Sequence, residues 1–145
     1  MLRIVMLSSV VAAAAVNTVV IKLSPTLPPA SAPAATRAAA IMARQIRQRY
    51  DTTVVSPAAT FSATADVTVT LALNTTIGEE GFAVSDASAD GADVLISGGD
   101  CGALLFGIGK FLRSSSYDAH FAPGGWRGSS APQRRGSFRA AYFAT

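Results

Sequence analysis

The sequence predicts an α+β domain in which a mostly antiparallel sheet of about four to five strands carries two helices packed on one face. Half of the 145 residues are hydrophobic and 14% are charged, which is typical of a globular chain with one core. Segments that begin near residues 34 and 101 have helical patterning, and short β-rich segments lie between them. The segments between residues 66 and 97 follow each other too closely for crossover helices. We therefore expect them to pair as antiparallel hairpin neighbours.

The N-terminus has the pattern of a secretory signal peptide. Arg3 precedes an uncharged stretch from Ile4 to Val16, and the small residues Ala12–Ala15 suit a cleavage site. The alternative interpretation is a first buried strand or helix of a cytosolic protein. A membrane anchor fits less well because the stretch is shorter than the ~20 residues of a membrane span. We expect residues 1–15 to be a leader and the protein to be secreted or periplasmic, with no membrane partner.

The first strand and the first helix follow this leader. Val16–Leu23 is β-branched and apolar, and the proline-rich segment after it excludes a helix. Strong helix formers predict a helix from Ala34 or Ala35 to about residue 51. Its expected buried stripe contains Ile41, Met42, Ile46 and Tyr50. Its arginines lie mostly off that stripe and form either a solvated face or a surface for an anionic ligand. They are Arg37, Arg44, Arg47 and Arg49.

Four strand segments are expected between the two helices. They are residues 52–55, 66–73, 81–87 and 93–97. The second alternates apolar residues with threonines, so its valines and leucines share one buried face. Phe82 and Val84 should point inward from the third. Asp90 and Gly91 mark a tight turn before the fourth.

The fourth segment continues into a glycine-rich turn and a helix, which is the order of elements in phosphate-binding loops. The spacing does not fit such a loop. Ser97 stands where a dinucleotide fingerprint needs its first glycine, and Ile108 stands where a Walker loop needs lysine. Asp100 at the helix start suits an N-cap and repels phosphate. We therefore expect no nucleotide and no other cofactor at this turn.

The glycines of this segment are expected to serve packing. Gly98 and Gly99 should allow positive φ in a sharp turn. Three glycines inside the helix should let it approach the sheet closely; they are Gly102, Gly107 and Gly109. The apolar stripe of this helix is predicted to contain Leu104, Leu105, Ile108, Phe111 and Leu112.

No other set of residues has the spacing of a catalytic or metal site. Cys101 and His120 are the sole cysteine and histidine, so a four-ligand zinc site is not expected. A Cys101–His120 nucleophile pair is the weaker alternative to a small buried thiol. The carboxylates show no spacing that indicates acid/base work. The basic clusters lack the interleaved aromatic residues of nucleic-acid binders.

Three residues are singled out for other roles. Asn74 begins an N-glycosylation sequon. Trp126 is either a sugar-stacking platform or, as we favour, a lid packed on the core. Arg139, a candidate substrate-side contact like Trp126, belongs to the apolar, strand-like segment Phe138–Thr145, which looks like the start of a following domain. Residues 116–137 are rich in Ser, Gly, Pro and Arg and are expected to be an irregular connector.

From about Val16 to Thr145, the order of these elements resembles the accessory N-terminal domain that precedes the (β/α)8 barrel of several glycoside hydrolases. The α-glucuronidase N-terminal domain and the second domain of β-hexosaminidases are the most similar. Arg139 matches an arginine at the barrel entry, although Ala140 replaces the glycine that commonly follows it. The other matching residues are Ile96, Gly98, Gly102, Leu105, Gly107, Phe111, Leu112 and Arg113.

The resemblance implies an accessory domain over residues 16–115 and carbohydrate, such as glucuronoxylan or amino-sugar chains, as the substrate class. It implies that the catalytic acids lie on a barrel domain, downstream or in trans, so the chain to Thr145 should lack glycosidase activity alone. On this view the chain is a fragment, a truncated gene product or a split-off domain. Two alternatives stay open: an independent secreted carbohydrate- or protein-binding module, and a small enzyme that uses Cys101.

Overall fold

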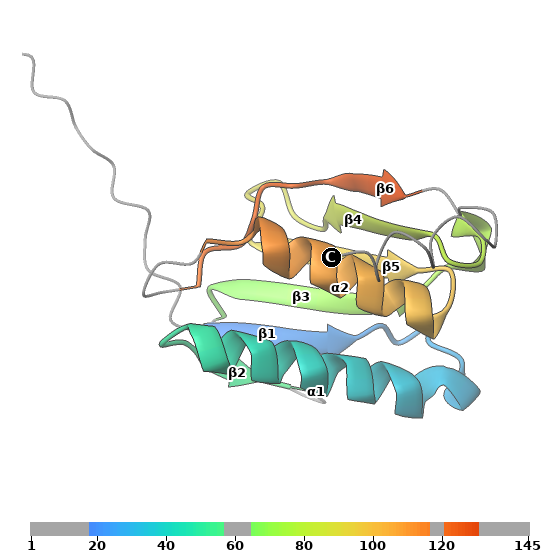
Figure 1. Cartoon of the computed structure of the whole chain (residues 1–145), viewed down its shortest axis with the longest axis horizontal. Helices are drawn as coiled ribbons and strands as arrows, with labels where there is room; N and C mark the ends of the chain where they lie inside the picture. Colours follow the sequence, from blue (N-terminus) through green and yellow to red (C-terminus); the bar gives the residue numbers. More distant parts are fainter. Residues whose placement is uncertain (1–17, 57–64, 117–120, 131–145) are drawn as a thin grey trace, which may run out of the picture.

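The computed structural model describes residues 18–56, 65–116 and 121–130. These residues form one sheet of six strands in the order β2-β1-β3-β5-β4-β6. Helices α1 and α2 both lie on one face of it and contact each other (Figure 1). In chain order the elements are β1 Thr18–Leu23, α1 Ala32–Arg49, β2 Thr53–Val55, β3 Val67–Leu73, β4 Phe82–Asp86, β5 Asp93–Gly98, α2 Cys101–Ser114 and β6 Gly128–Ser130, with short 3-10 turns η1 Pro29–Ser31 and η2 Thr75–Ile77.

The sheet is mixed and mostly parallel, so the fold class is α/β and the predicted α+β architecture with a mostly antiparallel sheet is wrong. β1 pairs in parallel with β2 and β3, and β3 pairs in parallel with β5. Among the described strands, β4 alone runs against its neighbours, which are β5 and β6. Antiparallel pairing is therefore confined to one edge of the sheet.

The route of the chain from β3 to β5 explains the error. After β3 the chain passes through η2 to β4, which lies on the far side of β5. β4 runs back along the sheet and a turn then leads into β5, which pairs with β3 in parallel. A parallel connection needs a segment that returns to the starting edge, and a strand serves as well as a helix. The short spacing of the segments between residues 66 and 97 excluded a crossover helix between parallel strands, but it did not exclude a strand as the returning segment.

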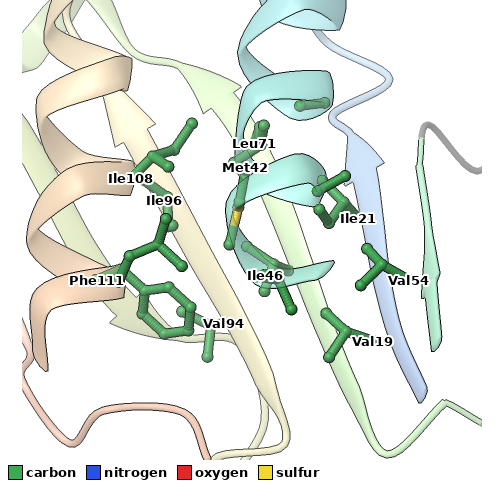
Figure 2. Packing of buried hydrophobic residues seen from close by; sticks show 14 of the residues in the cluster. Val19, Ile21, Met42, Ile46, Val54, Leu71, Val94, Ile96, Ile108 and Phe111 are labelled. Carbon is green, nitrogen blue, oxygen red and sulfur yellow. The ribbon is translucent and has the colours of Figure 1, made fainter. Parts of the chain in front are cut away.

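The core lies between the sheet and the two helices. In Figure 2, Met42 and Ile46 of α1 lie over Ile21 and Leu71, while Phe111 of α2 lies beside Val94. α1 meets this core largely through alanines, which allow a close approach to the sheet. The buried residues of α1 are Ala35, Ala38, Ala39, Met42, Ala43 and Ile46.

Two residues that were predicted to belong to the core lie outside it. Ile41 is 39% exposed and Leu105 is 42% exposed. Both were assigned by their hydrophobicity, whereas the buried arc of α1 is centred on the smaller alanines. Large apolar side chains therefore remain on the outside of the helix layer.

The predicted connector contributes a strand. β6 lies at residues 128–130 and pairs with β4 at the antiparallel edge. Its residues are glycine and serine, which have little preference for strands, so local propensity did not indicate it. The expected leader at 1–15 and the expected strand at 138–145 lie outside the described residues. No helix in the described ranges has both the length and the hydropathy needed to cross a membrane.

Candidate functional site

The glycine-rich turn between β5 and α2 is the first candidate site, because ligands of open α/β sheets bind beyond the carboxyl ends of parallel strands. Asp100 begins α2 there as its N-cap. Its Oδ1 accepts a hydrogen bond of 2.7 Å from the Ala103 amide, and its Oδ2 accepts one of 3.2 Å from the Glu80 amide. The predicted N-cap is confirmed, and both carboxylate oxygens are engaged by the backbone.

The space beside this turn is filled by the protein's own backbone. The Gly99 amide donates a 2.8 Å hydrogen bond to the carbonyl oxygen of Gly81. A Cβ atom at Gly99 would overlap the Gly78 carbonyl group, and one at Gly98 would overlap the backbone of Leu104. Residues 78–81 therefore pack directly against the turn.

The reason expected for Gly98 and Gly99 is wrong. Neither has a positive φ; among the described glycines, positive φ occurs at Gly78, Gly91 and Gly128. Gly98 and Gly99 are needed because other backbone segments lie where a side chain would be. Within α2, close approach to the sheet requires only Gly107, whose Cβ would lie 2.8 Å from Ile96 Cγ2. Gly102 is exposed, and Gly109 faces the side chain of Arg113.

The electrostatics of Asp100 suit a structural role. The hydrogen bond from the Ala103 amide is the main reason that the pKa of Asp100 lies below the ordinary aspartate value. In the turn before β5, the hydrogen bond from the Ser88 hydroxyl likewise lowers the pKa of Asp90. A general acid of a glycosidase needs a raised pKa. The pKa values of Asp90 and Asp100 are instead lowered.

Cys101 is the first residue of α2 and is partly exposed. His120, the other half of the hypothetical nucleophile pair, lies outside the described residues. Across the described ranges, no group of three His, Cys, Asp or Glu side chains is placed to hold a metal ion.

Trp126 lies just before β6 and packs against the antiparallel edge. Its ring centroid is 6.1 Å from that of Phe82, and Lys110 Nζ lies over the indole at 5.0 Å from its centroid. Arg127, the next residue, donates to Asp86 Oδ1 at 2.6 Å and to the Gly124 carbonyl at 2.7 Å. These contacts favour the lid interpretation of Trp126, because the ring already has neighbours from β4 and α2.

Asn74 is exposed in the turn that follows β3. Its Oδ1 accepts hydrogen bonds from the Thr76 amide at 3.1 Å and from the Thr76 hydroxyl at 2.6 Å. The sequon thus lies on an accessible turn, and its use stays a prediction. Arg139 lies outside the described residues.

Six residues lie on the exposed sides of the two helices. They are Arg37, Ile41 and Arg44 of α1 and Leu105, Phe106 and Arg113 of α2. Arg37, Ile41 and Arg44 share one side of α1 by the 3–4 spacing, and Phe106 and Arg113, seven residues apart, share one side of α2. The sequence had placed Arg37 and Arg44 off the buried stripe, as a solvated face or a surface for an anionic ligand, but had assigned Ile41 and Leu105 to the core.

Comparisons with known proteins identify no family for the chain. No family model matches it, and no curated protein matches it. Among solved structures it is similar to a GH138 enzyme described as targeting pectin rhamnogalacturonan II, with a TM-score of 0.43 and 16% sequence identity over 73% of this chain. The chain spans 15% of that enzyme's length, so the likeness is to a small part of a larger glycoside hydrolase. Similarity at this level carries no functional argument.

Proposed function

We propose that this chain is the non-catalytic N-terminal domain of a secreted, α-glucuronidase-like glycoside hydrolase and that it packs against a catalytic (β/α)8 barrel, encoded downstream or supplied in trans. The observation that carries the proposal is the structure of the segment 93–115, which holds most of the residues that resemble this family. A Cβ atom at Gly98 would overlap the backbone of Leu104, and one at Gly107 would lie 2.8 Å from Ile96 Cγ2. Ile96, Phe111 and Leu112 are buried. These five matched residues therefore have packing roles in the domain, which supports the proposal.

The positions of the carboxylates support a non-catalytic role. Asp66 Oδ2 accepts a 2.9 Å hydrogen bond from the Thr18 amide and so joins the starts of β3 and β1. Asp86 pairs with Arg127, Asp90 accepts from the Ala92 amide, and Asp100 caps α2. Glycoside hydrolysis needs two carboxyl groups that face one substrate about 5–10 Å apart, one of them with a raised pKa. These four aspartates instead hold turns, strand ends and a helix start.

The reading frame beyond codon 145 provides the test. The chain and the longer product are assayed on glucuronoxylan oligosaccharides and on a panel of aryl glycosides. We expect activity in the longer product, or in a mixture with a separately encoded barrel, and none in the chain alone. Absence of any encoded domain with paired carboxylates would contradict the proposal. Hydrolysis by the chain alone that is lost in Asp100→Asn would also contradict it.

The alternative is an independent secreted binding module. Its carbohydrate-binding form depends on Trp126, whose ring is approached by Lys110 and Phe82. Pull-down on insoluble xylan, with Trp126→Ala as the comparison, separates the two: binding that is lost in the variant would favour the module.

Export is part of the proposal. In a eukaryotic secretory host we expect cleavage near residue 15 and a glycan on Asn74 that Asn74→Gln removes, both read by intact mass.

A further inference from the structure

We propose that Arg47 closes one edge of the sheet, the β2 edge, against strand addition by a second copy of this chain. Nη2 of Arg47 donates a 2.6 Å hydrogen bond to the carbonyl oxygen of Val54 in β2. β2 ends the sheet on its side, with β1 as its one neighbour among the described strands. The proposal concerns this chain alone and does not depend on the proposed function.

The contact places the Val54 carbonyl group on the open side of β2. Val54 pairs with Val19 of β1, and both side chains are buried in the core beneath α1 (Figure 2). A carbonyl oxygen between two paired strands lies within the sheet, under such side chains, and accepts from the neighbouring strand. Arg47 is an exposed residue in the last turn of α1, so its guanidinium reaches β2 from outside the core. The oxygen that it contacts is therefore one that points away from β1.

The β2 edge has the composition of a good strand. Thr53, Val54 and Val55 are all β-branched and uncharged, and Thr53 is exposed. An open edge of this composition is a template for pairing with another chain. The strand at the other end of the sheet, β6, consists of a glycine and two serines, which have little preference for strands. The arginine thus lies at the edge with the stronger strand-forming sequence.

A second copy of the chain fits this edge because the edge is complementary to itself. Two β2 strands related by a two-fold axis can pair antiparallel, and each copy then contributes the same residues. The strand contains no charge, so this pairing places no like charges opposite each other within the two strands.

The contact made by Arg47 opposes that pairing in two ways. The guanidinium occupies the position beside the Val54 oxygen where the N–H of an added strand would have to lie. In a pair of copies, the Arg47 side chains would also approach each other, and like charges across an interface repel. An added strand must therefore break the hydrogen bond of Arg47 and displace its charge.

The test compares the self-association of Arg47→Met and of the parent chain by sedimentation equilibrium over a range of concentrations. Methionine keeps a long apolar stem but has no N–H donor and no charge. We expect the dimer association constant to rise about tenfold or more, because pairing no longer breaks a hydrogen bond from a charged group. Arg44→Met is the matched control: Arg44 is exposed three residues earlier on α1, and the change in charge is the same. It should associate as the parent does.

A second substitution locates the association. Thr53→Lys, added to Arg47→Met, puts a charge on the β2 edge itself and should return the association constant to the parent value. The proposal is wrong if Arg47→Met associates no more strongly than Arg44→Met, or if its association persists with Thr53→Lys. Circular dichroism shows whether each variant is folded.

A more conservative pair of variants keeps the test decisive if Arg47→Met does not fold. Arg47→Lys is then compared with Arg44→Lys. Lysine keeps the charge but lacks the planar fork of the guanidinium, so Arg47→Lys should associate more strongly than Arg44→Lys. Equal association constants in this pair would also overturn the proposal.

Discussion

The parallel part of the sheet and its antiparallel edge are held together in different ways. In the parallel part, Val19, Ile21, Val69, Leu71 and Ile96 are completely buried under α1 and α2, so apolar burial dominates. At the edge, β4 and β6 rely on particular side-chain contacts: Arg127 with Asp86, and Trp126 with Phe82 and Lys110. The hydrophobic pattern of the sequence therefore specifies the parallel part of the sheet. The antiparallel edge depends instead on contacts between single residues that lie far apart in the sequence.

Removing a core ring that α2 packs on the parallel part should have the largest effect. Phe111 is 0% exposed, and its ring centroid lies 6.1 Å from that of Phe121. Phe111→Ala should lower the free energy of unfolding by about 3–5 kcal/mol, because it leaves a cavity. Trp126→Ala, at the edge, removes a larger but only partly buried ring and should cost less, about 1–3 kcal/mol. Urea denaturation measures both. Equal losses, or a larger loss for Trp126→Ala, would remove the distinction between the two regions.

The junction of the two regions should be sensitive to a single methyl group. β5 belongs to both regions, and Gly99 lies just after it, against the turn that precedes β4. A Cβ atom added at Gly99 would overlap the carbonyl group of Gly78. Gly99→Ala forces backbone to move and should cost about 1–3 kcal/mol. Gly125→Ala is the control, since nothing lies within 4 Å of a Cβ there. Thermal unfolding should show a lower midpoint for the first variant alone. Two variants with the same midpoint would show that the turn can relax.

The sequence predicts the location of most elements because they depend on local signals. Alternation located β3, helix formers located α1, and the capping residue Asp100 located the start of α2. It did not predict which strands are neighbours, since the return of the chain through β4 is a property of the whole sheet. It also missed β6, whose glycine and serines have no strand preference and which pairs with β4 more than 40 residues earlier.

The candidate site follows the same rule. The N-cap at Asp100 was predicted correctly because it is a local feature. The reason that Gly98 and Gly99 are glycines was predicted wrongly, because the backbone that approaches Gly99 comes from a turn some 20 residues away. The exposure of Ile41 and Leu105 was missed because it depends on how the alanines of α1 and the stripe of α2 are set on the sheet. Hydrophobicity alone does not show whether Ile41 and Leu105 point toward the sheet or away from it.

The N-cap at the start of α2 should give a smaller effect with a defined pH dependence. The folded state lowers the pKa of Asp100, chiefly through the Ala103 amide, so its contribution is present above the unfolded aspartate pKa of about 3.9 and is lost as the pH falls through the folded value. Asp100→Ala should cost about 1 kcal/mol at pH 7. Asp100→Asn should retain most of the cap and lose less stability than the parent chain when the pH is lowered from 5 to 2. Melting temperatures across this range measure the difference; parallel curves for parent and Asp100→Asn would contradict it.

The ion pair at the antiparallel edge should give the smallest effect. Arg127 Nε lies 2.6 Å from Asp86 Oδ1, but the two side chains are 23% and 47% exposed, so water screens much of their attraction. Asp86→Asn should therefore cost less than about 1 kcal/mol, and the loss should diminish at high salt. Arg127 also donates to the carbonyl groups of Gly124 and Trp126, so Arg127→Ala should cost more than Asp86→Asn. A double-mutant cycle in urea denaturation isolates the coupling. A coupling energy as large as the loss in Phe111→Ala would mean that the edge is held by charge as firmly as the parallel part is by burial.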